Sequence, residues 1–354
     1  MVAYPYDWKM ESLENIAPLQ RGFDLPTSQI NHGNYPIVYS NGILNYHNDY
    51  KCEPPGVVTG RSGTIGNFTF VEERYWPHNT SLWVTDFKGN VPLFIYYFYQ
   101  TIGIEKMATG TGVPTLNRND IHNEVYAIPA SKDEQKAIAS ALSDFDEHID
   151  NLTELIEKKK AIRDGALEDL MSGRTRLDGF GGEWEDGTVG NILTVLHGKN
   201  QHLVESFSGK YPILGTGGIM GRATEFICDW ECVLIGRKGT IDRPFYMHEP
   251  FWVIDTLYYS KPKADQCVKF QYCLFCTINW YDYAESSGRP SLTRKAIEGI
   301  PISIPDIREQ QAIAQILTAM DEEIESLEAE KAKMMQIRDG AMDDLLSGRV
   351  RLRV

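Results

Sequence analysis

The chain of 354 residues contains one sequence unit twice, and this duplication limits the folds that it can adopt. At an offset of 176 residues, residues 35–37 (YPI) recur as residues 211–213. After the Ile-Pro dipeptides at 128–129 and 304–305 the offset becomes 175 and holds through the rest of both halves. Copies of this size are too large and too few for a solenoid, whose units span roughly 20 to 50 residues. The repeat therefore predicts a pseudo-twofold molecule made of two similar halves.

Each half ends in a long amphipathic segment without proline. Apolar residues recur there at alternating steps of four and three, which is a heptad seam. The first seam consists of Ile138, Leu142, Phe145, Ile149, Leu152 and Ile156. The second consists of Ile313, Leu317, Met320, Ile324 and Leu327, with Lys331 where a sixth apolar residue is expected. Gly165 and Gly340 cost about 1 kcal/mol each against alanine, which does not end a helix that packing supports. We therefore expect two helices of about 39 residues, each about 58 Å long.

A helix of this length must bury its apolar seam, and the chain supplies one partner with a matching pattern. A globular stretch of about 130 residues separates the two segments and allows the chain to return. We therefore expect the helices to pair as an antiparallel coiled coil, with the globular parts at opposite ends. The alternative is that each helix packs only against its own domain.

The globular parts have the pattern of mixed α and β structure. Short runs of strand composition, such as GVVTG at 56–60 and CVLIG at 232–236, alternate with glycine and asparagine turns. One apolar helix is expected in each part, at 92–102 and at 268–278. The predicted fold class is α+β, with two similar mixed α/β domains joined by the two long helices. The expected boundaries are 1–130 for the first domain, 131–176 for the central helix, 177–305 for the second domain and 306–354 for the C-terminal helix.

The net charge of −14 argues at first against nucleic acid, because duplex binding needs Lys and Arg to displace counterions from phosphates. Half of this charge lies in 131–176 and 306–354, so the acidic side chains can occupy helix faces away from DNA. No run of about 18 apolar residues occurs, and the first ten residues lack the pattern of a secretory signal. We therefore expect a soluble, cytoplasmic protein without a membrane segment.

The six cysteines are too few and too unevenly spread for a disulfide framework. Cys273 and Cys276 have the spacing of half a zinc site, with Cys228 and Cys232 as possible partners. The surrounding run QYCLFC is apolar, however, and buried free cysteine is common. The sequence therefore predicts no metal site.

The motifs of enzymes that act on DNA are missing from the sequence. The nearest string to the Asn/Asp-Pro-Pro-Tyr/Phe tetrapeptide of adenine methyltransferases is 53–56 (EPPG), which lacks both the amide and the aromatic ring that would stack a flipped base. Neither a G-x-x-x-x-G-K-[ST] phosphate loop nor an H-E-x-x-H motif occurs. We therefore predict no catalytic residue and no cofactor bound by this chain.

Two kinds of turn retain binding chemistry. The turn at 60–64 (GRSGT) and its counterpart at 236–240 (GRKGT) combine glycines, which permit close backbone approach, with groups that can hold a phosphate. The small polar loop at 109–112 (TGTG) corresponds to 286–289 (SSGR). The alternative is a tight hairpin with incidental charge. The predicted phosphate contacts are Arg61, Ser62, Gly63, Thr64, Thr109, Thr111, Arg237, Lys238, Gly239, Thr240 and Ser287.

The comparison of the two halves separates two classes of binding residue. Positions that are shared serve the scaffold or contact phosphate and sugar, which every half-site has. Positions that differ on the shared frame are candidates for reading base edges. In the first domain these candidates are His32, Asn34, Ser40, Asn41, His78 and Asn79. In the second they are Lys199, Asn200, Gln201, Thr216, Arg222 and Arg289. Any one of them could instead be an ordinary surface residue.

This arrangement resembles the specificity subunit of a type I restriction-modification system. The resemblance covers nearly the whole chain and includes the D/R-E-Q-x-A-I-A sequence that opens each long helix, at 133–139 and 308–314. The helix ends at 170–174 and 345–349 fit the same family, as do the Gly-x-x-Gly-Thr and Gly-x-Pro-x-Leu loops.

The resemblance implies a non-catalytic subunit that binds double-stranded DNA, with each domain reading one half of a bipartite, asymmetric site and the coiled coil setting the spacer. It also implies two copies of an adenine-N6 methyltransferase subunit, which use S-adenosylmethionine and dock on the helices. A restriction endonuclease and translocase subunit would use ATP and Mg²⁺. The chain is short for this family and acidic, so we expect its loops to need the partner for tight binding.

Two other hypotheses stay open. The chain could be a coiled-coil scaffold with two protein-binding domains, or a compact DNA-modifying enzyme with an unrecognised site. The scaffold predicts no salt-sensitive affinity for any duplex, whereas DNA readout predicts affinity that falls steeply with salt.

Overall fold

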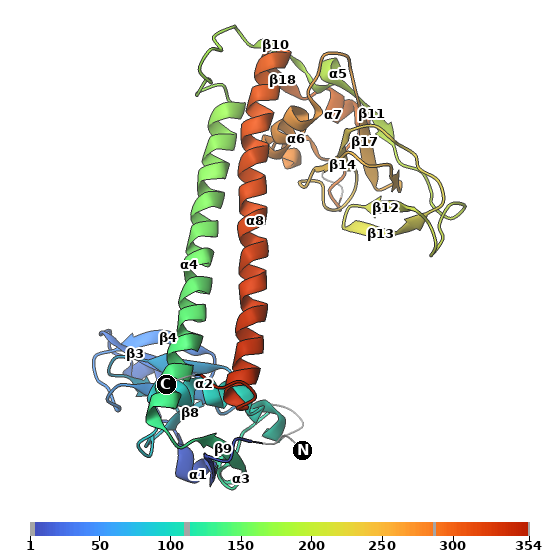
Figure 1. The fold of residues 1–354 in the computed structure, drawn as a ribbon. Coiled ribbons are helices and arrows are strands. Elements are labelled where there is room, and N and C mark those ends of the chain that lie inside the picture. Colours follow the sequence, from blue (N-terminus) through green and yellow to red (C-terminus); the bar gives the residue numbers. More distant parts are fainter. Residues whose placement is uncertain (1–3, 110–113, 286–287, 353–354) are drawn as a thin grey trace. The chain divides into compact units, whose positions relative to one another are not determined.

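The computed structural model describes residues 4–109, 114–285 and 288–352 and is drawn in Figure 1. It divides into two compact units. Unit 1 consists of residues 1–153 with 329–354, and unit 2 of residues 154–328. Each long helix therefore contributes one part to each unit.

The first half of the chain has the mixed composition that the sequence predicts. Its elements in order are β1 (Trp8–Ser12), α1 (Leu13–Ile16), β2 (Leu19–Arg21), η1 (Thr27–Gln29), β3 (Tyr35–Tyr39), β4 (Gly42–His47), β5 (Gly56–Gly60), β6 (Phe68–Val71), β7 (Trp76–Pro77), β8 (Ser81–Val84), α2 (Pro92–Thr101), η2 (Ile104–Met107), α3 (Arg118–His122), β9 (Val125–Pro129) and α4 (Lys132–Met171).

The second half repeats this series. Its elements are β10 (Glu185–Thr188), α5 (Val189–Ile192), β11 (Leu193–His197), β12 (Tyr211–Gly215), β13 (Gly218–Ala223), β14 (Cys232–Gly236), β15 (Phe245–Met247), β16 (Trp252–Val253), β17 (Leu257–Pro262), α6 (Val268–Thr277), η3 (Trp280–Tyr283), α7 (Arg294–Glu298), β18 (Pro301–Ile304) and α8 (Ile307–Leu346).

The sheets have the same strand order in both halves. In the first, β1 pairs with β9, a four-stranded sheet has the order β2-β8-β5-β6, and a three-stranded sheet has the order β4-β3-β7. In the second, the corresponding sheets are β10-β18, β11-β17-β14-β15 and β13-β12-β16. Even the register shift recurs, between Ile37 and Val38 and between Ile213 and Leu214. The sequence repeat is therefore also a repeat of topology, and the α+β prediction is confirmed.

Each domain core lies between its four-stranded sheet and one apolar helix. Strand β5 is buried along its whole length, and Val57 packs with Phe94 and Phe98 of α2. In unit 2, Val233 of β14 packs with Phe275 of α6. Helix α2 begins at a proline, whose fixed φ and missing N–H suit the first turn of a helix.

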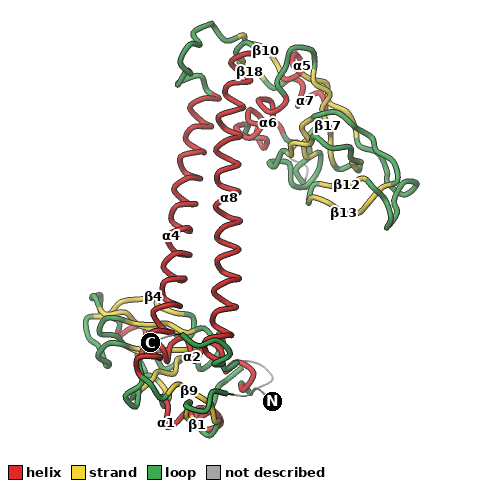
Figure 2. Tube along the Cα trace, in the orientation of Figure 1, coloured by secondary structure: helices red, strands yellow, loops and turns green. Residues whose placement is uncertain are grey.

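The two long helices are each continuous over 40 residues, as Figure 2 shows. Gly165 and Gly340 lie within these helices. Packing on the apolar side of each helix offsets the unfavourable helix propensity of glycine. In unit 1, Ile138 and Leu142 share a core with Met342 and Leu345 from the end of α8. The start of α4 therefore packs against the end of α8, which shows that the helices run antiparallel, as predicted. This contact excludes the alternative that each helix packs only against its own domain.

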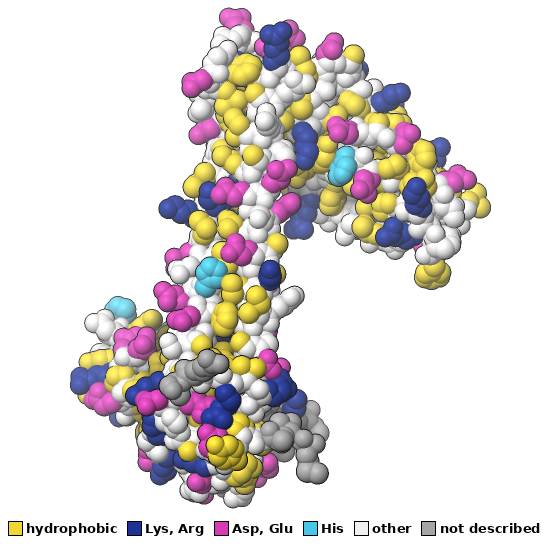
Figure 3. Space-filling view, viewed as in Figure 1, with side chains coloured by type: hydrophobic (Ala, Val, Ile, Leu, Met, Phe, Trp, Pro, Cys, Tyr) yellow, Lys and Arg dark blue, Asp and Glu magenta, His cyan; other side chains and the backbone are white. Residues whose placement is uncertain are grey.

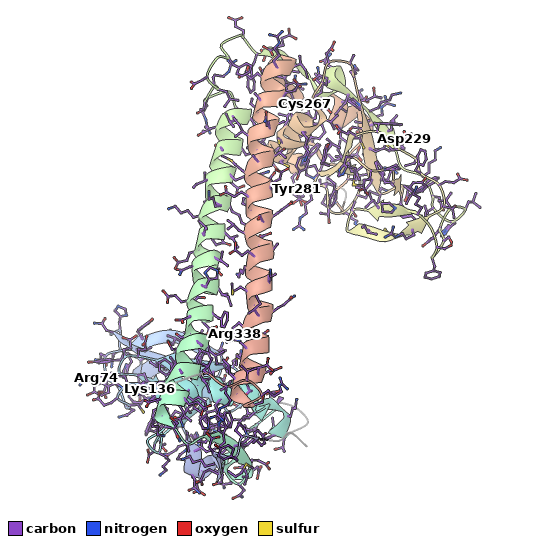
Figure 4. All side chains as sticks on the ribbon, in the orientation of Figure 1. Arg74, Lys136, Asp229, Cys267, Tyr281 and Arg338 are labelled. Carbon is purple, nitrogen blue, oxygen red and sulfur yellow. The ribbon has the colours of Figure 1, made fainter. Side chains whose placement is uncertain are left out.

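An equivalent ion pair joins the two long helices in each unit. Arg338 of α8, labelled in Figure 4, donates from Nε to Oδ1 of Asp146 at 3.0 Å. Its counterpart in unit 2 is Arg163, whose Nε donates to Oδ1 of Asp321 at 2.8 Å. These are the same two positions of the repeat with the helices exchanged, so the pair obeys the internal pseudo-symmetry.

We expect the Asp146–Arg338 pair to contribute a coupling energy of about 1 kcal/mol, because both side chains are partly shielded from solvent, with 33% and 19% exposed. Tyr97 also donates to Asp146 from its hydroxyl at 2.7 Å. Urea denaturation of Asp146→Ala, Arg338→Ala and the double variant measures the coupling. Strictly additive losses would show that the pair does not stabilise the helix contact.

The D/R-E-Q sequence at the start of each long helix has a structural role. Gln135 is fully buried, and its Nε2 donates to the carbonyl oxygen of Pro129 at 2.9 Å. Its Oε1 accepts from the backbone N–H of Val91, one residue before α2, also at 2.9 Å. Gln310 does the same in unit 2, donating to Pro305 O at 2.9 Å and accepting from Cys267 N at 3.1 Å. The glutamine thus ties the helix start to the domain.

The glutamate beside each glutamine receives an arginine that follows the end of the other long helix. Arg176 donates from Nε and Nη2 to the buried carboxylate of Glu309, at 2.7 and 2.6 Å. Arg351 donates in the same way to Glu134 and also to Asp7, with Nη2 2.8 Å from Asp7 Oδ2. Arginine presents two parallel donors to a carboxylate, so each helix start is fixed by the tail of the partner helix.

The cysteine pairs lie in different parts of the core. Cys273 packs in the cluster around α6, while Cys228 and Cys232 belong to a separate cluster, with their Sγ atoms 3.9 Å apart. Burial raises the pKa of the Cys273 thiol to about 12. The four cysteines therefore do not converge on one site. In the part of the chain that the structure describes, none of the helices has the length and apolarity needed to cross a bilayer.

Candidate nucleic-acid interface

Two loops that are about 50 residues apart in the sequence meet in the first domain. The N–H of Leu116 donates to Arg61 O at 2.8 Å, and the N–H of Gly63 donates to Pro114 O at 3.2 Å. The Gly-x-x-Gly-Thr turn and the Gly-x-Pro-x-Leu loop thus form one surface. A Cβ atom at Gly60 would lie 1.6 Å from Thr64 O, so the turn can close only with glycine there.

The second domain repeats this junction. The N–H of Leu292 donates to Arg237 O at 2.9 Å, and the N–H of Gly239 donates to Pro290 O at 3.0 Å. The guanidinium of Arg289 lies directly over Gly239, within 2.6 Å of the place a Cβ would take. Two predicted phosphate contacts, Lys238 and Thr240, are exposed on this turn.

The arginine of each turn also serves the fold. Arg61 donates from Nη1 to the carbonyl oxygen of Asn79 at 3.1 Å, and Arg237 donates from Nη1 to that of Asp255 at 3.0 Å. Both side chains are only half-buried, so their remaining N–H groups can still reach a phosphate.

Of the other predicted phosphate contacts, Ser62 and Thr109 each form a β-bridge with Thr115, and Thr64 is exposed beside them. Thr111 and Ser287 lie outside the described residues. The structure therefore brings the two predicted loops of each domain together, which the sequence did not indicate.

Four of the six predicted base readers of the first domain lie around this junction. A Cβ at Gly60 would also be 2.9 Å from Ser40 O, which places the turn of half-buried Ser40 and exposed Asn41 beside it. The N–H of His78 donates to Val38 O at 2.9 Å, and Asn79 follows directly.

The His78 ring is 4.4 Å from the ring of Tyr39, and its burial lowers the histidine pKa, so the imidazole is neutral at pH 7. The other two candidates, His32 and Asn34, are exposed before β3, at the opposite end of that strand.

The second domain distributes its predicted base readers in a similar way. The N–H of Lys199 donates to Val253 O at 2.9 Å, beside the 254–256 segment that borders Arg237, and Asn200 and Gln201 follow. Thr216 occupies the turn between β12 and β13. Arg222 is at the far end of that hairpin, where its Nη1 donates to Lys210 O at 3.2 Å. Arg222 is therefore separated from the others.

A groove of about 690 Å³ adjoins the junction in the first domain and contains residues that the sequence reasoning missed. Arg21, Asp24 and Arg118 line it together with Arg61. Arg21 and Asp24 form an exposed ion pair, with Nη2 3.0 Å from Oδ1. These residues could have been found by extending the comparison of the two halves to the segment at 20–24, where the copies differ.

Residues 5–161 and 181–335 each match the family described as "Type I restriction modification DNA specificity domain". The chain belongs to this family. It is a DNA specificity subunit of a type I restriction-modification system, and such a subunit is itself non-catalytic.

Two curated relatives match this chain over most of its length and over most of their own. A putative type I specificity subunit of Mycoplasma genitalium is 23% identical over 96% of this chain and 94% of its own length. The specificity subunit of the type I restriction enzyme MjaVIII of Methanocaldococcus jannaschii is 22% identical over 73% of this chain and 71% of its own length.

Solved structures show the same fold. The crystal structure of an S subunit from M. genitalium has a TM-score of 0.71 at 20% identity, covering 98% of this chain and 97% of that chain. A chain from a type I restriction-modification assembly has a TM-score of 0.60 at 13% identity, covering 98% and 100%.

Proposed function

We propose that each globular domain of this specificity subunit reads one half of a bipartite, asymmetric DNA site and that the paired helices set the spacer between the half-sites. The supporting observation is that both domains build the same junction of a Gly-Arg-x-Gly-Thr turn with a Gly-x-Pro-x-Leu loop, while the surrounding side chains differ. A shared frame suits phosphate, which is common to all DNA, and the differences suit base edges.

The proposed domain limits are those expected from the sequence, with recognition domains at 1–130 and 177–305 and helical segments at 131–176 and 306–354. The phosphate contacts are assigned to the turns that begin at Gly60 and Gly236, and the base contacts to the side chains around them. The cytoplasm is the proposed location.

We further propose that the helices dock two copies of an adenine-N6 methyltransferase subunit, which holds S-adenosylmethionine, and that an endonuclease subunit of the complex uses ATP and Mg²⁺. Figure 3 shows acidic and basic side chains interspersed on the visible helix surface, which suits a polar docking face. Negative charge there is also unsuited to DNA and thus leaves the DNA contact to the loops.

The proposal is tested by sequencing methylated adenine in the genomic DNA of cells that carry this chain with its methyltransferase partner. Cells that lack only this chain are the control. We expect one bipartite methylated motif to disappear with the chain. Unchanged methylation would contradict the proposal and would favour a protein-binding scaffold.

The replacement Lys238→Gln is expected to weaken DNA binding by the methyltransferase complex nearly equally for all sequences. It should reduce the slope of log affinity against log salt by about 1, because one phosphate contact and its released counterion are lost. Fluorescence anisotropy between about 50 and 200 mM salt measures the slope. The matched control is Lys88→Gln, because Lys88 already pairs with Asp86 at 3.1 Å. An equal effect of the two replacements would remove Lys238 from the interface.

A further inference from the structure

A carboxylate lies in the groove of the first domain among three arginines. Asp24 is 70% exposed and lines the groove with Arg21, Arg61 and Arg118. Its Oδ1 accepts from Nη2 of Arg21 at 3.0 Å and from Nδ2 of Asn79. Asn79 is in turn held through its carbonyl oxygen by Arg61. The acid is therefore positioned by the same residues that form the proposed interface.

A carboxylate at a surface that binds phosphate weakens binding through like-charge repulsion. The hydrogen bond from Asn79 lowers the pKa of Asp24, so that the group is charged at neutral pH and can only accept hydrogen bonds. On a duplex, the donors that face an acceptor in the major groove are the exocyclic amino groups, of which cytosine N4 is the usual partner of Asp. A base contact would offset the repulsion.

The backbone shows that residues 21–24 and 197–200 occupy equivalent places in their domains. The N–H of Phe23 donates to Pro77 O at 2.8 Å, as that of Lys199 donates to Val253 O at 2.9 Å. Each segment also receives an indole N–H, from Trp76 to Phe23 O at 3.3 Å and from Trp252 to Lys199 O at 3.0 Å. The two copies can therefore be compared position by position.

The acid and the amide change places between the two copies. Asp24 and Asn79 of the first domain correspond to Asn200 and Asp255 of the second, and Arg21 corresponds to His197. By contrast, the other two arginines of the groove are kept, as Arg237 and Arg294. The groove thus combines two arginines that both copies keep, which suit phosphate, with polar side chains that differ between the copies, which suit base edges.

We infer that Arg21 and Asp24 read one C·G base pair in the half-site of the first domain, and that His197 and Asn200 impose a different base pair at the corresponding place in the second. The inference rests on the proposed DNA readout. Asp24 accepts from cytosine N4, and Arg21 donates to O6 and N7 of the paired guanine. The amino group of cytosine and the two acceptors of guanine lie side by side on the major-groove edge of the base pair, as Asp24 and Arg21 lie side by side in the groove of the protein. Asn200 suits adenine, whose N6 and N7 offer a donor and an acceptor.

The exchange variant Asp24→Asn with Asn79→Asp tests the inference in the methyltransferase complex. Methylation sequencing reads both half-sites of the motif, and binding to duplexes that vary at each position gives the discrimination. We expect the preference for C·G at one position of the first half-site to fall by about 5- to 150-fold, the range for one good base contact, while the second half-site is unchanged. The reciprocal exchange at Asn200 and Asp255 should alter only the second half-site.

The matched control is Glu53→Gln in the same domain, because Glu53 is 62% exposed and pairs with Arg74 at 3.0 Å just as Asp24 pairs with Arg21. We expect it to leave both half-sites unchanged. If the exchange variant no longer supports any recognition, Arg21→Lys takes its place, since it keeps the charge and loses the two-pronged contact.

Full discrimination in either the exchange variant or Arg21→Lys would overturn the inference. A wild-type complex without sequence preference would instead contradict the proposed function.

Discussion

Replacing Gln310 by leucine is expected to lower the free energy of unfolding by about 3 kcal/mol. The side chain is 1% exposed, and leucine would leave the partly buried N–H of Cys267 and the buried carbonyl oxygen of Pro305 without their partner. Each unsatisfied buried group costs about 1 to 3 kcal/mol. Chemical denaturation followed by circular dichroism measures the change.

Gln311→Leu is the matched control, because the neighbouring residue undergoes the same replacement but is exposed on α8. We expect it to change stability by less than about 0.5 kcal/mol. The equivalent variant Gln135→Leu should destabilise unit 1 for the same reason, since Gln135 bonds Val91 and Pro129. Equal losses for Gln310→Leu and Gln311→Leu would show that the buried bonds do not contribute.

Inserting one heptad into both long helices is expected to lengthen the recognised spacer by about three base pairs while leaving both half-sites unchanged. Seven residues add about 10 Å of helix, and base pairs follow one another at about 3.4 Å. A heptad also returns the apolar seam to the same face. The insertion points after Thr153 and Glu328 coincide with the border between the compact units and lie away from the Asp146–Arg338 and Arg163–Asp321 pairs.

Methylation sequencing of cells with the altered complex reads the new motif directly. The control carries the heptad in α4 alone, which makes the helices unequal and should impair recognition altogether. Altered half-sites in the double insertion would contradict the separation of base reading from spacer setting.

The internal duplication made much of the fold accessible from the sequence. Heptad spacing and the absence of proline predicted both long helices to within a few residues, since helix periodicity is a local property of the chain. Their antiparallel pairing was predicted because each long helix must bury its apolar seam, and the other helix has a matching one. The seam residues Ile138 and Leu142, however, also belong to the core of the first domain, together with Phe94 of α2. The heptad pattern alone does not reveal this second contact.

The candidate site was predicted in pieces. The turns at Arg61 and Arg237 stood out because glycine, arginine and a hydroxyl side chain recur there in both copies. Arg21 and Asp24 were missed, because a lone Arg at the end of β2 and a lone Asp three residues later have no distinctive local pattern. The hydrogen bond from Asn79, 55 residues away, and the groove that it lines with Arg61 mark Asp24 as part of the candidate interface.

The sequence by itself determined the duplicated plan, the long helices, the composition of the domains and the family. Repetition, periodicity and glycine-rich turns are all encoded within short stretches of chain. The tertiary structure alone decided which distant residues meet, as Arg61 meets Leu116, Arg176 meets Glu309 and Asp24 meets Asn79. Such contacts depend on the packing of whole elements against one another, and no local pattern in the chain specifies them.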